Sequence, residues 1–288
     1  PEVIGQGITV YFTDLDWGGV SCAILADRMF KSSPTIAVPE GAFRNGWPQA
    51  EGFDAAAQAD VAGAELLGKR QEQFLEAWSA RRDGRFAAAV LSQTPLCNLA
   101  TLPPAATSGS GLARAAIPER GVYPEGYTLA ADADSNGWPQ TARNRAVRLI
   151  SDADAVHICG DQHLAAVVEY GVESFDDGAW AFSVPAVSNT WPRRWFPPEP
   201  GANRPSAAPR YTGEFLDGFG NRMRVHAVAN PARSGRHPAA LHDRMPGYGI
   251  IRFDRASGRA TFECWQRPER GVNAPPTQFP GWPQHSAN

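Results

Sequence analysis

The sequence predicts an α/β fold, and three observations support this prediction. Short apolar runs that suit buried strands alternate with helix-like segments over the first 165 residues. Strand-like runs dominate after that point. Hydrophobic residues make up 43% and charged residues 20% of the 288 positions, which is enough for a large core. We therefore expect a layered architecture that becomes more mixed toward its end, without a composition break between two independent domains.

The alternation in the first half depends on five segments. Strands are expected at residues 20–25, 86–91 and 155–159, where apolar side chains follow one another almost without interruption. A helix is expected at residues 64–79, because apolar residues recur on one face and charged residues on the other. A second helix is expected to start near Pro139, since proline at an early helical position costs no hydrogen bond.

The second half is predicted to contain mainly strands, at residues 224–228, 249–253 and 260–265. The last two strands are expected to form a hairpin through a turn at residues 254–258. The 28 glycines and 25 prolines favour long irregular stretches around this core. We place these stretches at residues 31–54, 98–130 and 188–213.

Charge and hydropathy exclude several classes of function. The net charge of −3 gives no bulk electrostatic basis for a nucleic-acid partner or an anionic membrane surface. No apolar run approaches the ~18 residues of a membrane span, and we expect no signal peptide because no basic and then apolar segment opens the sequence. The chain begins at Pro1 and its first recognisable strand follows almost at once, so we expect a processed or truncated piece of a longer protein.

The four cysteines form no Cys-x-x-Cys pair, which argues against a zinc ribbon or a redox motif. Their apolar surroundings favour buried free thiols over disulfides. They are Cys22, Cys97, Cys159 and Cys264.

The most informative motif follows the strand at residues 155–159, where Asp161 and His163 come directly after Gly160. Ligands of open α/β sheets bind at the carboxyl ends of strands. A carboxylate and an imidazole suit a catalytic metal such as Fe, Zn or Mn. The spacing alone leaves a second interpretation open, in which Asp161 caps a following helix and His163 lies on the surface.

This motif resembles the Gly-Asp-x-His signature of PhoD-like phosphatases (the alkaline phosphatase D family), which belong to the calcineurin-like metallophosphoesterase superfamily. Other segments resemble the family in order and spacing, including a helix with the pattern Leu-Gly-x-x-Gln-x-x-Phe-Leu. One departure concerns Asp27, which stands one position later than the Asp of the family's Leu-Asp-x-Arg strand end. The similar segments are residues 67–75, 92–93, 134–139, 230–231 and 247–250.

The resemblance implies a mixed β-sandwich flanked by helices, in the four-layer αββα arrangement of metallophosphoesterases, that lacks its N-terminal part. The domain would cover residues 1–268, with a tail at residues 269–288. Most metal ligands of the family precede the first strand seen here. Because two ligands cannot hold a dinuclear metal centre, the resemblance leaves open whether this chain is active alone.

The function implied by the resemblance is metal-dependent hydrolysis of phosphoric esters, either monoesters or diesters, by a metal-activated water. The metal ions would be Fe, Ca, Zn or Mn, and the location would be extracytoplasmic. Asp161 and His163 would be metal ligands, and Arg28 would contact phosphate unless it forms a structural ion pair. Asp134 and Trp138 would contact the substrate, although the pattern around Asp134 favours a helix cap.

An alternative function is a metal-free module of the same fold that recognises a glycan or an envelope polymer through Trp-rich loops. Five tryptophans lie in loop-like sequence: Trp47, Trp138, Trp191, Trp195 and Trp282.

Other polar residues have less specific patterns. His157 lies inside an apolar strand and is expected to be a core histidine, whereas His226 suits either face of its strand. The arginine pair Arg193-Arg194 is expected to be part of a solvated loop, with binding of an anionic substrate as the alternative. Asp14 and Asp16 are expected to be exposed loop acids, with remnants of an upstream metal site as the alternative.

Overall fold

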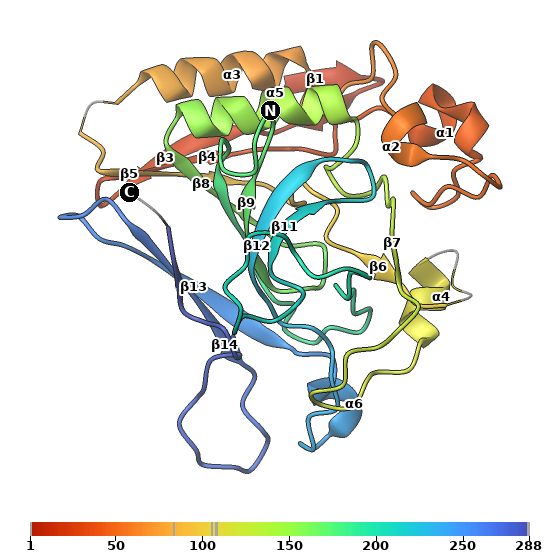
Figure 1. The fold of residues 1–288 in the computed structure, drawn as a ribbon. Helices are drawn as coiled ribbons and strands as arrows, with labels where there is room; N and C mark the ends of the chain where they lie inside the picture. Colours follow the sequence, from red (N-terminus) through yellow and green to blue (C-terminus); the bar gives the residue numbers. More distant parts are fainter. Residues whose placement is uncertain (1, 83, 105, 107–108, 287–288) are drawn as a thin grey trace.

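The structure is a computed structural model that describes every residue except 1, 83, 105, 107–108 and 287–288. Its main element is a mixed sheet of eight strands (Figure 1). Its strands β10, β8, β5 and β4 are adjacent and parallel to one another, and the other strands are antiparallel to their neighbours. In spatial order the strands are β11 (Gly213–Leu216), β12 (Arg222–Val228), β9 (Ala166–Tyr170), β10 (Trp180–Ser183), β8 (Ala155–Cys159), β5 (Ala87–Leu91), β4 (Val20–Ile24) and β3 (Thr13–Trp17).

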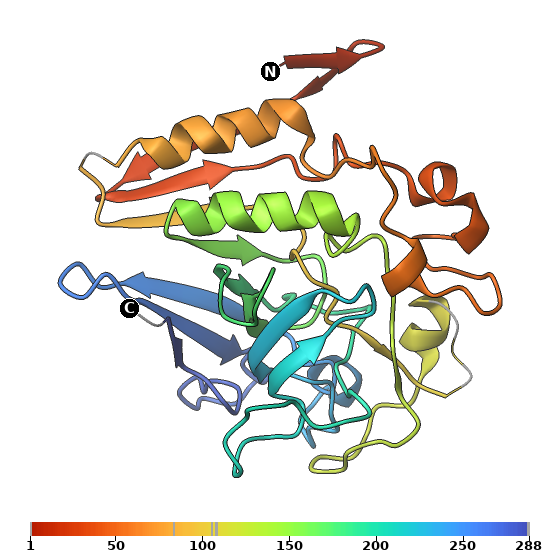
Figure 2. The ribbon, with the colours of Figure 1, turned by 45° about the horizontal axis from the view of Figure 1, so that its top comes forward.

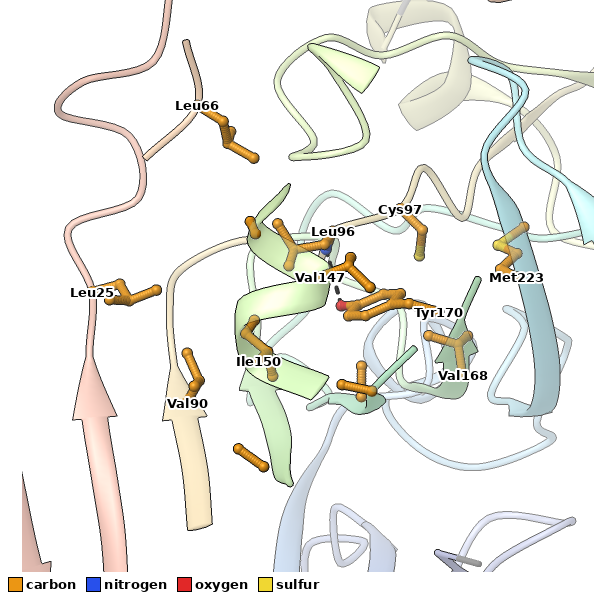
Figure 3. Close-up of a cluster of buried hydrophobic side chains, with 14 of the residues drawn as sticks. Leu25, Leu66, Val90, Leu96, Cys97, Val147, Ile150, Val168, Tyr170 and Met223 are labelled. Atoms are coloured by element: carbon orange, nitrogen blue, oxygen red, sulfur yellow. Dashed lines mark hydrogen bonds between the residues drawn. The ribbon is translucent and has the colours of Figure 1, made fainter. Parts of the chain in front are cut away.

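Two helices, α3 (Gly68–Ala80) and α5 (Gln140–Asp152), lie side by side over one face of this sheet (Figures 1 and 2). The core between the helices and the sheet includes Leu25 directly after β4, Val90 of β5 and Ile150 of α5 (Figure 3). The hydroxyl of Tyr170 accepts a hydrogen bond from the backbone N–H of Leu96 inside this core at 2.9 Å. The loop after β5 is therefore fixed to β9 by a buried polar contact.

A second sheet packs on the opposite face and consists of β13 (Gly247–Phe253), β14 (Ala260–Gln266) and β15 (Gln284–His285). Phe182 and Phe262 lie in the core between the two sheets, with ring centroids 5.8 Å apart. The described elements thus form three layers, with helices, the large sheet and the small sheet in that order. A helical layer over the outer side of β13–β15, which the four-layer arrangement would add, is not among the described elements.

Shorter elements complete the description. They are β1 (Glu2–Gly5), β2 (Ile8–Val10), α1 (Pro34–Ala37), the 3-10 helix η1 (Pro39–Gly41), α2 (Ala55–Gln58), β6 (Thr101–Leu102), α4 (Gly109–Arg114), β7 (Thr128–Leu129) and α6 (Ala239–His242). Across the described ranges, no helix has the length and apolar character that crossing a membrane requires.

The predicted mixed α/β class and the main strands and helices are confirmed, with shifted boundaries. The helix expected from residue 64 begins at Gly68, whose φ of +74° is a left-handed conformation that side chains disfavour. A Cβ at this position would lie 2.8 Å from the Cβ of Phe30, so the backbone also passes too closely for another residue. The helix expected near Pro139 begins at Gln140, because Pro139 has an extended conformation with ψ of 140°.

The segment expected to be a tail contributes to the core between the sheets. Phe279 is 3% exposed and Trp282 is 8% exposed, and both belong to the cluster that contains Phe262. The backbone N–H of Phe279 donates to Cys264 O at 2.9 Å, which attaches the segment to β14. The expected boundary at residue 268 stays a prediction, but the following residues are not a loose extension.

Phe279→Ala tests this packing. We expect it to lower the free energy of unfolding by about 3–5 kcal/mol, as truncation of a buried Phe does. Val272→Ala is the matched control in the same segment, because Val272 is half exposed. Urea denaturation measures both variants, and equal, negligible losses would contradict the packing of this segment.

Candidate functional site

The carboxyl ends of β4, β5 and β8 meet at one edge of the large sheet, and polar residues follow each of them. Arg28 follows β4, Gln93 and Thr94 follow β5, and Asp161 follows β8. Ligands of parallel sheets bind at this edge. The sequence motif therefore lies where the fold favours a binding site.

Asp161, which follows β8, contacts side chains that follow both of the other strands. Its Oδ1 accepts a hydrogen bond from Gln93 Nε2 at 3.1 Å, and its Oδ2 accepts one from Thr94 Oγ1 at 3.4 Å. Arg28 Nη1 lies 3.4 Å from Oδ2, while Arg28 Nη2 lies 3.4 Å from Asp134 Oδ1. The guanidinium thus bridges two carboxylates at long distances, and its side chain remains 37% exposed. The structure shows the ion-pair interpretation of Arg28 and leaves the group accessible from solvent.

Asp161 and His163 both have left-handed backbone conformations, with φ of +60° and +53°. Such conformations are uncommon outside glycine and often occur at functional sites. No helix follows, because the turn leads directly into β9, so the interpretation of Asp161 as a helix cap is wrong. Asp134 likewise precedes no helix directly, since α5 begins at Gln140 after the extended Pro139.

His163 is held in one orientation. Its Nδ1 lies 2.8 Å from the backbone oxygen of Trp191, and Asn189 Nδ2 donates to the backbone oxygen of His163 at 2.9 Å. A carbonyl oxygen can only accept, so Nδ1 carries a proton, and in the neutral ring Nε2 is then the acceptor. Metal-binding histidines commonly donate their other ring N–H to a carbonyl in this way.

In the described part of the chain, no three His, Cys, Asp or Glu side chains gather as a metal cluster would require. Asp14 pairs with Arg81 at 2.8 Å and lies on β3, as Asp16 does, so the expected loop at these positions is wrong. His226 stacks on Trp180 with centroids 4.2 Å apart. Neither joins Asp161.

The segment after β4 also fixes the loops around Arg28. Asp27 is buried, and its carboxylate accepts hydrogen bonds from Gln93 N at 3.2 Å and Thr94 N at 3.0 Å. Asn136 Nδ2 donates to the same carboxylate at 2.6 Å. One side chain therefore connects the loop after β5 to the loop that carries Asp134.

Lys31 holds the same loop from the other side. Its Nζ donates to Ala133 O and Ser135 O, both at 2.6 Å, and lies 5.9 Å from the ring centroid of Trp138. Burial lowers the pKa of Lys31 to about 7, although the carboxylate of Asp134 partly opposes this shift. The sequence analysis does not identify Asp27, Lys31 or Asn136 as site residues. The one sequence feature that points to this group is the shift of Asp27 by one position from the Asp of the family's Leu-Asp-x-Arg strand end.

Trp138 is fully buried and donates from Nε1 to Ala59 O at 2.8 Å. A side chain without exposed surface cannot touch a substrate, so the expected substrate contact is wrong. Four of the five loop tryptophans are buried, and Trp191 alone among them is exposed, at 44%. The aromatic platform of the alternative binding module therefore does not form in this structure.

The arginine pair at 193–194 is internal rather than solvated. Arg193 binds Asp132 at 2.6 Å, and its guanidinium lies 5.0 Å from the Trp47 ring centroid. Arg194 is fully buried and donates to backbone oxygens, including Ala116 O at 3.0 Å. Both arginines therefore stabilise loops.

His157 is a core histidine, as the sequence predicts. Its Nε2 lies 2.7 Å from Ser92 Oγ, and its Nδ1 lies 2.8 Å from the hydroxyl of Tyr170. Burial lowers the pKa of His157 to about 3, so the ring is neutral at physiological pH.

Lys31→Met tests the burial of Lys31. Between pH 7 and pH 10 the unfolded chain binds more protons than the folded chain at this residue, so wild-type stability rises with pH. We expect the stability of the variant relative to wild type to fall across this window in urea denaturation. Lys69→Met on the exposed side of α3 is the control, and a constant difference for both variants would contradict the burial.

Comparison with known proteins gives one structural similarity. No protein-family model matches the chain, and no curated protein matches its sequence. The chain is similar to the solved structure of PhoD, with a TM-score of 0.51 and 13% sequence identity. The match covers 95% of this chain and 42% of the PhoD chain, so this chain spans less than half of that protein's length. At this identity the similarity concerns the fold, and the chain has a PhoD-like α/β fold.

Proposed function

We propose that the chain carries part of the active site of a metal-dependent phosphoric ester hydrolase. The observation that carries this proposal is the turn after β8, which presents Asp161 and His163 at the carboxyl edge of a PhoD-like sheet. The hydrogen bond from His163 Nδ1 to Trp191 O leaves Nε2 as the free ligand atom. The similarity to the Gly-Asp-x-His motif supports the same function.

The residues fit a metal ion as two of its ligands. Asp161 supplies a hard carboxylate oxygen and His163 a neutral imidazole nitrogen, a donor pair that suits Fe, Zn or Mn, while Ca would favour oxygen ligands. A metal ion bound there would activate water and neutralise charge on a phosphoryl group. The remaining ligands would come from residues outside the described part of the chain.

The neighbouring side chains have distinct roles in this proposal. Gln93 and Thr94 orient the carboxylate of Asp161 through their hydrogen bonds. Arg28 offers a planar guanidinium to a phosphate ester and exchanges its weak contacts with Asp134 and Asp161 for the stronger pairing with phosphate. Asp134 lies at the rim, where its exposed carboxylate faces an incoming substrate.

Metal uptake tests the ligand assignment directly. The protein as its cell makes it is incubated with Mn²⁺, Zn²⁺, Fe²⁺ or Ca²⁺, and after removal of free ions elemental analysis should find bound metal on the wild type. We expect Asp161→Asn and His163→Gln each to lower the bound metal at least tenfold, because each removes a ligand. Asp152→Asn is the matched control, since Asp152 is exposed at the end of α5, before β8 begins.

Hydrolysis of p-nitrophenyl phosphate and bis(p-nitrophenyl) phosphate then separates a monoesterase from a diesterase. EDTA should abolish the activity, and Arg28→Met should reduce kcat/KM by at least tenfold while metal content stays constant. Metal uptake that is equal in wild type, Asp161→Asn and Asp152→Asn would overturn the proposed function. An extracytoplasmic location stays a prediction.

A further inference from the structure

A cavity lies where the chain leaves β12 and passes the small sheet. Its volume of about 380 Å³ falls within the range of small-molecule sites. Ala229 after β12, Met245 before β13 and Phe279 all line it, and all three belong to or pack against the core cluster between the two sheets. The cavity is therefore on the face of the large sheet that carries β13–β15.

The strand directions place this cavity at the edge of the large sheet that also carries Asp161. Strand β12 is antiparallel to β9, β9 is antiparallel to β10, and β10 is parallel to β8. Strand β12 therefore runs in the same direction as β8, and both strands end at the same edge. Ala229 directly follows β12, and Asp161 follows β8.

A backbone hydrogen bond limits the distance between the cavity and the turn that carries His163. Ala229 N donates to Ala165 O at 2.9 Å, and Ala165 stands two positions after His163. Consecutive Cα atoms lie about 3.8 Å apart and hydrogen-bonded neighbours on adjacent strands about 5–6 Å, so the Cα atoms of Ala229 and His163 are at most roughly 14 Å apart. A small organic molecule can span such a distance.

A side-chain amide joins the same turn to another wall of the cavity. Asn189 Nδ2 donates to His163 O at 2.9 Å and also to Arg244 O, and Arg244 immediately precedes Met245. Asn189 is buried, so this connection is shielded from water. The turn that presents His163 and the wall formed by Met245 are therefore held together.

Aromatic side chains form much of the lining. They are Tyr123, Phe196, Tyr211 and Phe279. The rings of Tyr123 and Phe196 meet edge to face, with centroids 5.5 Å apart and planes at 86°. A further aromatic ring packs favourably against such walls in offset or edge-to-face contacts. The lining therefore favours a flat aromatic ring over a flexible alkyl chain.

The charged side chains among the described lining residues already have partners. Glu119 binds Arg233 at 2.9 Å, and Arg120 Nη2 donates to Ser234 O at 3.4 Å. Both residues are exposed, as is Val122 beside them, so the cavity opens to solvent on this side. The described lining offers no buried charge to an ionic ligand, and we expect a neutral group in the cavity.

Tyr211 supplies a polar group within this apolar lining. The hydroxyl of Tyr123 donates to Pro197 O at 2.6 Å, and the side chain of Asn230 exchanges two hydrogen bonds with the backbone of Trp195. The hydroxyl of Tyr211 has no hydrogen-bond partner among the described residues. Burial raises the pKa of Tyr211, so this hydroxyl keeps its proton and can donate to an oxygen atom of a ligand.

We propose that this cavity binds the organic group of the phosphate ester, and that this group carries a neutral aromatic ring on a short linker. The inference rests on the proposed function, because the phosphate of the same molecule would lie at Asp161 and His163. Neither of these residues lines the cavity, so a linker of a few atoms must join the ring to the phosphate. Binding of the ring, which takes no part in the reaction, would hold the phosphate in place.

Isothermal titration calorimetry with 4-phenyl-1-butanol tests the cavity without any reaction. The protein as its cell makes it is first treated with EDTA, so that no metal ion contributes to binding. We expect a Kd below about 1 mM and a negative change in heat capacity, because apolar surface becomes buried. The comparison probe is 1-octanol, which has an alkyl chain in place of the ring, and its Kd should be at least fivefold higher.

Ala232→Phe tests the location of the binding. Ala232 lines the cavity and is partly buried, so a larger side chain would fill the space, and we expect the Kd of the aromatic alcohol to rise at least tenfold. Ala57→Phe is the matched control, because Ala57 is exposed on α2 and does not line the cavity. Both variants should melt within about 3 °C of the wild type, which reports an intact fold.

Tyr211→Phe tests the polar contact while it keeps the ring. Loss of one hydrogen bond between neutral groups should raise the Kd about threefold to tenfold. Tyr248→Phe is the matched control, since Tyr248 is 40% exposed on β13 and lies outside the lining. The comparison of these two variants also decides the location of binding if Ala232→Phe does not fold.

Binding of 4-phenylbutyl phosphate connects the cavity to the site at Asp161. With Mn²⁺-loaded protein, this ester should displace 4-phenyl-1-butanol and bind at least tenfold more tightly than the alcohol. Asp161→Asn should remove most of this difference and leave the Kd of the alcohol unchanged. Both measurements report binding and need no turnover.

Three results with the alcohols would overturn the inference: no measurable binding of 4-phenyl-1-butanol, an equal Kd in wild type and a folded Ala232→Phe, or tighter binding of 1-octanol. Simultaneous binding of the alcohol and the ester would also overturn it, since the cavity would then serve another ligand. Metal uptake that depends on Asp161 without binding of the alcohol would overturn this inference but not the function. Binding of the alcohol without metal uptake would overturn the function and leave the cavity as a site for an aromatic alcohol.

Discussion

The candidate site depends on the buried carboxylate of Asp27. This side chain accepts hydrogen bonds from two backbone N–H groups of the loop after β5 and from Asn136 in a loop 109 positions away. A buried carboxylate is costly unless its oxygens are satisfied by donors, and here three donors compensate for the lost hydration. Because the donors come from separate loops, satisfying one charge fixes the relative positions of Arg28, Gln93 and the loop of Asp134.

Lys31 and Arg193 also hold a loop in place through contacts with groups distant in the sequence. Lys31 binds two backbone oxygens on either side of Asp134, and Arg193 neutralises the buried Asp132 nearby. The loop between residues 132 and 136 is therefore held by side chains of both charges although it has no regular secondary structure. An irregular loop that is fixed in this way can present Asp134 in a defined position without a helix or strand beneath it.

The sequence indicates the sheet and its helices well because their signals are local. Unbroken apolar runs identify β4, β5 and β8, and the strand end before Asp161 follows from the same run. The roles of Asp27, Lys31 and Trp138 depend on partners between 66 and 109 positions away, and no local pattern encodes such contacts. The packing of Phe279 was missed for the same reason, because Gly and Pro around it resemble a tail while its partners lie on β14.

The buried side chain of His157 makes the stability of the fold depend on pH in the acidic range. Its ring joins Ser92 at the end of β5 to Tyr170 on β9, and burial keeps its pKa near 3, whereas an unfolded histidine titrates near pH 6.5. In this pH range the unfolded chain binds a proton at His157 and the folded chain does not. The free energy of unfolding therefore declines as the pH falls from about 6.5 toward 3. Ser92 immediately precedes Gln93, so acidification weakens the scaffold directly beneath Asp161.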